Sequence, residues 1–537
     1  MTQSRTGLIA VLFASAQLFG SELHFALQSE PKTLDPLQVS DGPSEVVRYL
    51  TGGVLVRMDR QTGKSQPSIA ESWKLTDGGK TVVFKFRSNL KFSDGTPFSS
   101  EDVVFTIRRM GEEKLHSPVA DSFKQDGVLP TPEALGPNEV AVHFPNPPSS
   151  VDRLFDQLAI QSAHSPKKEM AVLGPFFVED RKAGAYLVLR RNSNYWKRDS
   201  AGHRLPYLDS VRIDIQKNRD IERRRFEQGE LNLMNALDTE TFSQLRDDHP
   251  SLVRDGGPSL NTEFVWFNQR AASPLPAYKK EWFRSQNFRR AISASIQRAD
   301  IVKLAYQGLA EPSAGPVSSA DPVWFNKAIK PQAYDPTAAL TKLKADGFQS
   351  ANGKLIDRAG HPVEFSLVTN SGNKQRNRVA ALIEQDLAKV GITVRIVTLD
   401  FPSLIERISR TFDYEAALLS FVNADGDPNS QMNVWLSSAE QHAWNPGQKS
   451  PETSWEAEID RLMQSQAVTS DLKKRKAAFD RVQAIISEQA PFIYLVHPRV
   501  LGAVSPQLRG ASLAPLWPNL LWNADQLDVV PQISLVK

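Results

Sequence analysis

Alternation of apolar and polar residues marks the first clear strands of this chain. A strand leads into the tight turn Asp77-Gly78-Gly79, and a second strand alternates between apolar and polar residues over 82–86. A third short strand is expected at 90–92, followed by another turn at 93–95. The pattern therefore predicts a small antiparallel unit early in the chain.

Helix signals lie between and after these strands. A helix is expected over 44–50, and Ser99 or Ser100 is expected to cap the next one, because two acidic residues follow in its first turn. Further along, apolar residues recur at helical spacing over 288–298 and over 376–387. These segments predict amphipathic helices with one face on a core.

Strands follow the later helices as well. Gly391 is expected to stop the second amphipathic helix, and apolar runs at 392–399 and 416–421 indicate strands after it. Helix and strand signals thus alternate along the whole chain, which predicts an α/β fold.

Length and charge limit the possible classes. The 537 residues exceed what one hydrophobic core usually supports, so two or three domains are expected. The 64 basic and 61 acidic residues are spread along the chain, and the two basic runs, 223–225 and 473–476, fall in predicted helices. This balance gives no case for nucleic-acid binding, which needs a clustered basic face.

The N-terminus has the layout of an export signal. Arg5 precedes an apolar stretch at 7–19 that is short for a membrane span, and small residues around Ala16 offer a cleavage site, with Gly20 as an alternative. A buried first helix is the competing interpretation. The sequence holds no cysteine, which excludes disulfides, thiol catalysis and a lipid anchor on cysteine. We therefore expect residues 1–20 to be a signal peptide and the protein to be free in the periplasm.

Catalytic and metal motifs are missing. The sequence has neither a Gly-x-Ser-x-Gly nucleophile elbow nor a phosphate-binding Gly-x-x-x-x-Gly-Lys loop, and its nine histidines are not spaced for a metal. Residues 425–429 resemble the start of a calcium loop, but Ser430 and Leu436 stand where the glycine and the bidentate glutamate belong. The sequence therefore predicts no enzyme, no metal site and no cofactor.

The order of landmarks nevertheless matches a known family. The segment from Pro67 to Phe105 contains P-S-I-A-E-S-W, the D-G-G turn and F-S-D-G-T-P-F-S-S-E-D-V-V-F in sequence. Together with T-L-D-P at 33–36, N-x-N-Y-W at 192–196 and L-P-Y-L-D-S-V at 205–211, it resembles the extracellular solute-binding proteins of family 5. One departure is Gln297, where the family usually has aspartate.

The resemblance implies a fold of the periplasmic-binding-protein type, with two large lobes, a hinge between them and an extra insert domain. Lobe 1 would comprise residues 21–60, 171–260 and 490–537. The insert domain would comprise 61–170, and lobe 2 would comprise 261–489. Chain crossings near 260 and 490 would form the hinge.

The resemblance also implies a function. The protein would be a monomeric periplasmic receptor that captures short peptides between its lobes and delivers them to the permease and ATPase of an ABC importer. One alternative keeps the scaffold and changes the ligand to a metal chelate, a haem or an opine-like compound. The other is a sensory or chaperone-like binding protein that takes no part in transport.

The resemblance places the ligand next to the strand at 416–421. In the family an extended strand offers backbone groups to the ligand, here from Ser420 to Asn423, and an aspartate accepts the peptide's ammonium group. Counted back from Asp427-Pro428, that aspartate falls at Ala424, and Asp425 comes one residue later. Either the loop bulges so that Asp425 serves, or free amino termini are not bound.

Other side chains are candidates for the remaining contacts. Arg376 is the expected partner of a ligand carboxylate, in preference to Lys374 and Arg378. Trp266, Phe421 and Trp435 are expected to line side-chain pockets. The alternative interpretations are that the aromatics belong to the core, that Arg376 is a surface residue, and that Asp425 and Asp427 only form a turn.

Overall fold

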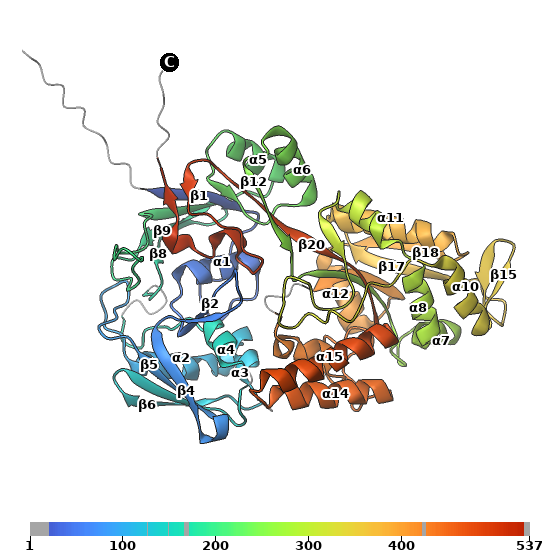
Figure 1. Ribbon diagram of the computed structural model, residues 1–537, viewed down its shortest axis with the longest axis horizontal. Coiled ribbons are helices and arrows are strands. Elements are labelled where there is room, and N and C mark those ends of the chain that lie inside the picture. Colours follow the sequence, from blue (N-terminus) through green and yellow to red (C-terminus); the bar gives the residue numbers. More distant parts are fainter. Residues whose placement is uncertain (1–20, 126, 149, 166–170, 422–425, 531–537) are drawn as a thin grey trace, which may run out of the picture.

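The computed structural model describes residues 21–125, 127–148, 150–165, 171–421 and 426–530. Figure 1 shows two halves side by side, one formed by the N-terminal part of the chain together with the C-terminal segment and one by residues from the middle and late part. The strand β20 (Phe492–Val504) runs from one half into the other. We call the first half lobe 1 with its insert domain, and the second half lobe 2.

Lobe 1 is built on a mixed sheet of four strands. The order is β1 (Glu22–Leu27), β10 (Ser210–Ile215), β9 (Tyr186–Arg191) and β8 (Phe176–Lys182), with β1 parallel to β10. The helix α1 (Gly42–Thr51) contacts β8, and the Asp41 side chain caps it by accepting from the Ser44 backbone N–H. The core between them contains Leu23, Phe25, Val46 and Leu50. The two strand residues are two positions apart and the two helix residues are four apart, so each pair lies on one face of its element.

The insert domain is an antiparallel sheet with helices. Its strand order is β4 (Ala70–Thr76), β5 (Thr81–Phe86), β7 (Glu139–His143) and β6 (Thr131–Gly136). The helices are α2 (Ser100–Met110), α3 (Pro118–Phe123) and α4 (Val151–Gln157). The predicted turn at 77–79 is confirmed, with positive φ at all three residues. The predicted cap is confirmed as a capping box between Ser99 and Asp102.

The prediction of a short strand at 90–92 is wrong. The structure has only an isolated bridge between Lys91 and Pro97 there. The Phe92 N–H donates to the Thr96 carbonyl, and the chain reverses at Gly95, where φ is 90°. The two arms of this turn are therefore too short for a hydrogen-bonded ladder.

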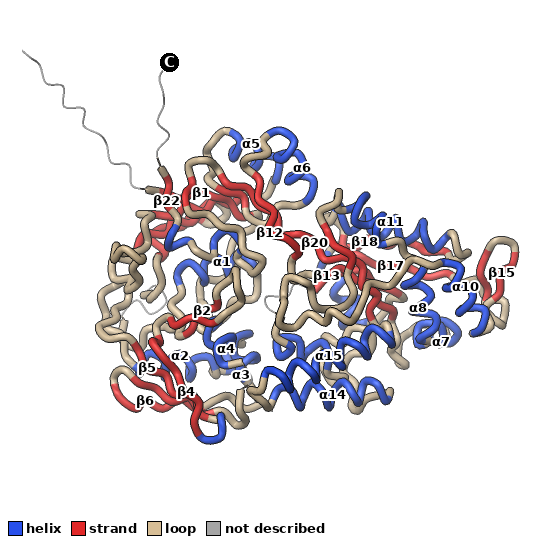
Figure 2. Tube along the Cα trace, in the orientation of Figure 1, coloured by secondary structure: helices blue, strands red, loops and turns tan. Residues whose placement is uncertain are grey.

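Lobe 2 has a sheet with helices on both faces (Figure 2). Along it β20 is followed by β13 (Thr262–Phe267), β19 (Ala416–Phe421), β17 (Glu364–Asn370) and β18 (Thr393–Leu399). On one face lie α7 (Ala277–Arg284), α8 (Gln286–Ala294), α10 (Pro336–Ala345) and α11 (Lys374–Ala388); on the other lie α12 (Phe401–Glu406), α13 (Met432–Trp435), α14 (Ser454–Ala467) and α15 (Leu472–Gln489). Alternate residues of β13 fill the two cores, Val265 and Phe267 on the first face and Phe264 and Trp266 on the second.

The strand β20 belongs to both lobes. Its first residues pair with β13 and with β14 (Ala310–Pro312), and its last residues pair with β12 (Val253–Pro258) and β11 (Leu233–Met234). Residues from 492 to 496 thus belong to the lobe 2 sheet, although the predicted lobe 1 segment began at 490. The other predicted domain boundaries stay predictions.

The remaining elements are short or lie at the edges. They are α5 (Arg219–Glu227), α6 (Thr239–Asp248), α9 (Arg298–Asp300), β2 (Val56–Met58), β3 (Ser65–Pro67), β15 (Gln349–Ala351), β16 (Lys354–Ile356), β21 (Leu508–Arg509) and β22 (Asp528–Val529). Within the described ranges, none of the helices has the length and apolar character needed to cross a membrane.

Candidate functional site: the edge of the lobe 2 sheet that faces lobe 1

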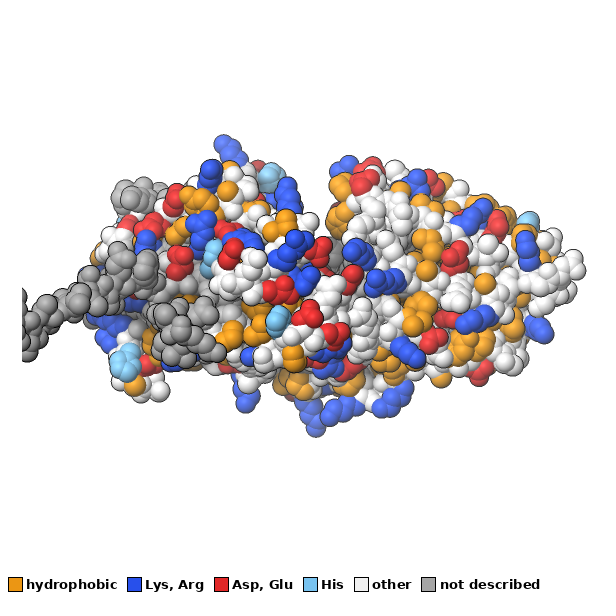
Figure 3. All heavy atoms as spheres, turned by 90° about the horizontal axis from the view of Figure 1, so that it is seen from above, with side chains coloured by type: hydrophobic (Ala, Val, Ile, Leu, Met, Phe, Trp, Pro, Cys, Tyr) orange, Lys and Arg blue, Asp and Glu red, His pale blue; other side chains and the backbone are white. Residues whose placement is uncertain are grey.

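Strand directions bring several chain ends to one edge of lobe 2. The strand β20 runs toward lobe 1 and is antiparallel to β13, which in turn is antiparallel to β19. The strands β17 and β18 are parallel to β19, so all three end on the side of lobe 1. The surface is hollowed between the two halves (Figure 3). In open α/β sheets ligands bind beyond the carboxyl ends of strands, which makes this edge the candidate site.

A buried ion pair holds this edge together. The Arg376 guanidinium in the first turn of α11 donates from Nε and Nη2 to the two carboxylate oxygens of Glu263, at 2.9 and 2.8 Å. Its remaining donors reach Asn370 Oδ1 at 2.6 Å and Ser420 Oγ at 2.9 Å. Burial lowers the pKa of Arg376, but the neighbouring Glu263 outweighs burial and holds this pKa above its usual value. The arginine is therefore a fixed cation bound to three strand ends.

This arrangement changes what Arg376 can offer a ligand. Its side chain is 9% exposed and that of Glu263 is 7% exposed, so the pair is largely shielded from water. The positive charge is balanced inside the protein, and Glu263 and Ser420 are directly opposite each other in the β13–β19 ladder. The binding of a ligand carboxylate by Arg376 stays a prediction, but its buried ion pair is incompatible with the surface-residue alternative.

Phe421 and Ser420 end β19 at the same edge. Phe421 is half-buried, and its ring lies 4.8 Å from the ring of Phe264 and 5.7 Å from that of Phe492, measured between centroids. The predicted contacts of Asn423 and Asp425 fall on residues outside those the structure describes. The described part of the site ends at Phe421 on one side and begins again at Gly426 on the other.

Asp427 is a buried turn former. Its Oδ1 accepts from the Asn429 backbone N–H at 2.9 Å and from Arg475 Nη2 at 2.6 Å. Its Oδ2 lies 3.9 Å from Nε of Arg153, which belongs to α4 of the insert domain. The turn interpretation holds for Asp427, and the Arg153 contact shows that the chain just past residue 425 lies at the interface of the lobes.

Further contacts join the lobes near the hinge. Gln375 on α11 donates to Thr239 Oγ1 on α6 at 3.0 Å. Lys374 and Arg378, the two alternatives to Arg376, each lie 3.8 Å from Glu240 of the same helix. These cations therefore face lobe 1.

The two predicted tryptophans lie in the lobe 2 core. Trp266 is 3% exposed and donates from Nε1 to Tyr414 Oη, and Trp435 is 1% exposed and donates to Gln431 Oε1. Their surroundings match the alternative interpretation, in which an aromatic at strand spacing is a core residue. Their pocket-lining role stays a prediction.

Sequence reasoning missed Glu263 and Asn370. Glu263 had a readable signal, because it is a charged residue inside the otherwise apolar strand 262–267. A carboxylate in a buried strand requires a cation, and Arg376 supplies it. Asn370 had no signal beyond its place at the end of a predicted strand.

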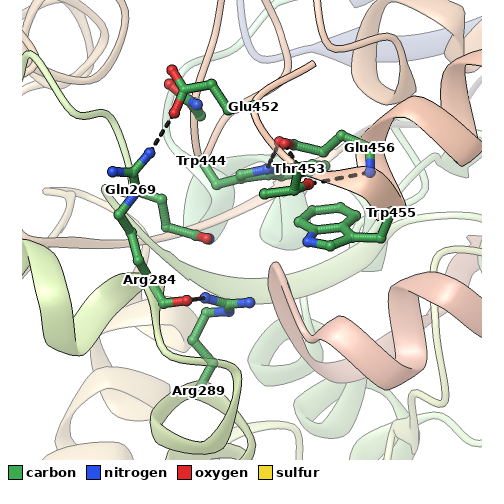
Figure 4. A pocket seen from close by; sticks show the side chains of 9 residues that line it. Gln269, Arg284, Arg289, Trp444, Glu452, Thr453, Trp455 and Glu456 are labelled. Carbon is green, nitrogen blue, oxygen red and sulfur yellow. Dashed lines mark hydrogen bonds and ion pairs between the residues drawn. The ribbon is translucent and has the colours of Figure 1, made fainter.

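Two cavities lie elsewhere in the molecule. One, of about 50 Å³, is lined in part by the polar network around Glu456 in lobe 2 (Figure 4). Burial raises the pKa of Glu456, but hydrogen bonds from His442, Thr453, Gln448 and Trp444 outweigh burial and hold the pKa at about 2. The other, of about 200 Å³, lies in lobe 1 between Tyr49, Trp196 and Trp522. Neither contains a predicted ligand residue, and the described residues include no group of three side chains suited to a metal.

Comparison with known proteins agrees with this architecture. The model of the bacterial extracellular solute-binding proteins, family 5, matches residues 64–443. The oligopeptide-binding protein AppA of Bacillus subtilis is 24% identical over 92% of this chain and 90% of its own length. Its solved structure in complex with a nonapeptide aligns with a TM-score of 0.73 at 23% identity, covering 95% of this chain and 99% of that one.

A second solved structure is NikA from Brucella suis in complex with Fe(III)-EDTA. It aligns with a TM-score of 0.81 at 19% identity and covers 95% of this chain and all of that one. Both structures confirm the predicted α/β fold with two lobes. The family match extends over most of the chain, and the family consists of binding receptors and not of enzymes. The protein belongs to the bacterial extracellular solute-binding proteins, family 5.

Proposed function

We propose that this protein is the periplasmic receptor of an ABC importer and captures short peptides between lobe 1 and lobe 2. The observation that carries the proposal is the edge where β17, β18 and β19 end opposite lobe 1, reached across a hinge made by β20. Closure of such a hinge encloses a solute between two lobes. The family match and the peptide complex of AppA support peptides as the solute.

The strand end at Ser420 and Phe421 suits a peptide ligand. An extended backbone can pair with an extended peptide through main-chain hydrogen bonds, which tolerate many side-chain sequences. The half-buried Phe421 ring adds an apolar surface for one ligand side chain. The permease and ATPase are the proposed partners, and the signal-like N-terminus supports export to the periplasm.

One observation favours a second candidate. Ala424 stands at the position where the family's ammonium-binding aspartate was expected, and NikA, which was solved with a metal chelate, shares the fold. A metal chelate is therefore the alternative ligand class on the same scaffold.

Mass spectrometry of the solute that co-purifies from the native host tests both candidates. A mixture of short peptides of varied sequence is the expected result, with a stoichiometry near one peptide per protein. A single metal chelate in place of peptides would contradict the peptide proposal and favour the alternative. Protein unfolded and refolded without solute serves as the control for carry-over.

A further inference from the structure

Asp321 is a buried carboxylate in the loop between β14 and α10. The residue is only 8% exposed. Its Oδ1 accepts from the backbone N–H groups of Val323 and Trp324 at 3.0 and 3.1 Å. Its Oδ2 points toward Gly426, where an added β-carbon would overlap this oxygen. The carboxylate thus has one oxygen fixed by a turn and one directed at Gly426.

The surroundings of Asp321 differ from those of the other buried carboxylates in the described part of the chain. Asp102 has both oxygens bonded to backbone N–H groups, at 2.8 Å each. The rest each have a Lys, Arg or His nitrogen within 4.0 Å: Asp156, Glu222, Glu263, Asp386, Asp427, Glu456 and Asp525. Among the described residues no such nitrogen lies within that distance of Asp321, and its Oδ2 accepts no hydrogen bond from them.

The position of Asp321 is at the interface of the lobes. Gly426, which its Oδ2 approaches, precedes Asp427, and Asp427 lies 3.9 Å from Arg153 of the insert domain. The loop that carries Asp321 follows β14, which pairs with β20 at the crossing between the lobes. A group held between the lobes beside Gly426 would therefore be within reach of Asp321.

Burial of a carboxylate without a cation is unfavourable, because the lost hydration is not replaced. Two backbone N–H donors on Oδ1 reduce the cost but leave the charge uncompensated. A ligand that brings a positive charge would replace that missing hydration, and the paired charges would hold it strongly in a site closed to water.

We propose that Asp321 binds an ammonium group of the ligand, namely the free amino terminus of a peptide. The proposal rests on the proposed function in that the cation belongs to a peptide. It assigns the charge recognition to a loop distant in sequence from the 420–428 segment. The receptor would then prefer peptides with a free amino terminus although Ala424 carries no charge.

The experiment compares Asp321→Asn with the unmodified protein. Asparagine keeps the Oδ1 acceptor for Val323 and Trp324 and removes the charge. The matched control is Asp335→Asn. The Asp335 side chain likewise accepts from a backbone N–H group, that of Ala338 at the start of α10. The probes are two synthetic pools of Ala-Xaa-Ala tripeptides without Lys, Arg or His, one with free and one with acetylated amino termini. Bound peptide is quantified by mass spectrometry after gel filtration and affinity by calorimetry.

The expected result is that the unmodified protein and Asp335→Asn bind the free pool at least tenfold more tightly than the acetylated pool. Asp321→Asn is expected to lose at least tenfold in affinity for the free pool and to change little toward the acetylated pool. Equal binding of the two pools by the unmodified protein would overturn the proposal while leaving the peptide function intact, and this comparison needs no variant to fold. Unchanged affinity of Asp321→Asn would overturn it equally.

If neither pool binds, the proposed function fails, and the co-purifying solute decides the role of Asp321. A solute with a positive group that Asp321→Asn no longer retains would support the proposal. A solute without such a group, or one retained by this variant as by the unmodified protein, would overturn it.

Discussion

Replacement of Arg376 by methionine tests whether the edge of lobe 2 depends on the buried ion pair. Methionine keeps an apolar stem of similar length but leaves Glu263, 7% exposed, without its cation. Removal of one partner of a buried pair costs about 3–5 kcal/mol, because the remaining charge stays desolvated. Arg376→Met and Glu263→Leu should therefore each lower the free energy of unfolding by that amount.

The double variant separates the ion pair from ordinary packing. With both charges replaced by apolar side chains no buried charge is left unpaired, so its loss should be far below the sum of the two single losses. A coupling energy of about 2 kcal/mol or more is expected from the double-mutant cycle. Urea denaturation followed by tryptophan fluorescence and by far-UV circular dichroism measures all four proteins.

The control is an ion pair on the same sheet whose two partners both reach solvent. Arg395→Met removes a cation of β18 that is 60% exposed and pairs with Glu364, which is 38% exposed, so it should cost less than about 1 kcal/mol. If Arg376→Met costs no more than Arg395→Met, or if the two single losses add without coupling, the ion pair does not stabilise this edge and the reasoning is wrong.

Three further expectations concern the hinge, a turn and the contact between the lobes. Burial lowers the pKa of His497 to about 4, so below pH 6.5 the unfolded chain takes up a proton that the folded protein does not. Protonation of His497 in the unfolded chain should therefore lower the free energy of unfolding by about 3 kcal/mol between pH 6.5 and pH 4. Urea denaturation at a series of pH values should show this decrease for the unmodified protein and not for His497→Gln. In the same denaturation assay, Gly391→Ala should lower the free energy of unfolding by about 1–3 kcal/mol more than Gly353→Ala does. Both glycines have positive φ, but only at 391 would the added β-carbon overlap neighbouring backbone atoms. Arg153→Ala should weaken ligand binding about fivefold in calorimetry by removing a partly buried contact to Asp427, and unchanged affinity would show that this contact does not favour closure.

Local elements of this fold follow from the sequence because their signals are local. The strand at 416–421 is recovered with its ends unchanged, since an apolar run between polar segments limits it on both sides. The helix predicted at 376–387 is found as α11, and Gly391 stops it with a φ of 79°. The strand predicted at 90–92 failed because alternation over three residues does not reveal how soon the chain reverses.

The candidate site depends on contacts between residues that are far apart in the sequence. Arg376 and Glu263 are 113 positions apart, and their pairing follows only from the order of β13, β19 and β17 in the sheet. The sequence could therefore single out Arg376 as a candidate site residue, because it lies beside a loop. It could not identify Glu263 as the residue that balances the charge of Arg376. The double membership of β20 was hidden for the same reason, because its partners in the two lobes are set by the order of strands in the sheet and not by its own sequence.

The charges at the interface between the lobes sort into two groups, and this sorting bears on specificity. Glu263 and Asp427 are neutralised by arginines of the protein itself, with distances of 2.6 to 2.9 Å, before any ligand binds. Such pairs hold strand ends and turns in place but offer a ligand little net charge, because breaking them would leave a buried ion unpaired. Of the buried carboxylates Glu263, Asp427 and Asp321 at this interface, only Asp321 has no cation among the described residues. A cleft whose own charges are internally balanced accepts neutral backbone readily, so discrimination between charged and blocked peptide termini falls to Asp321, the buried carboxylate at this interface that has no cation among the described residues.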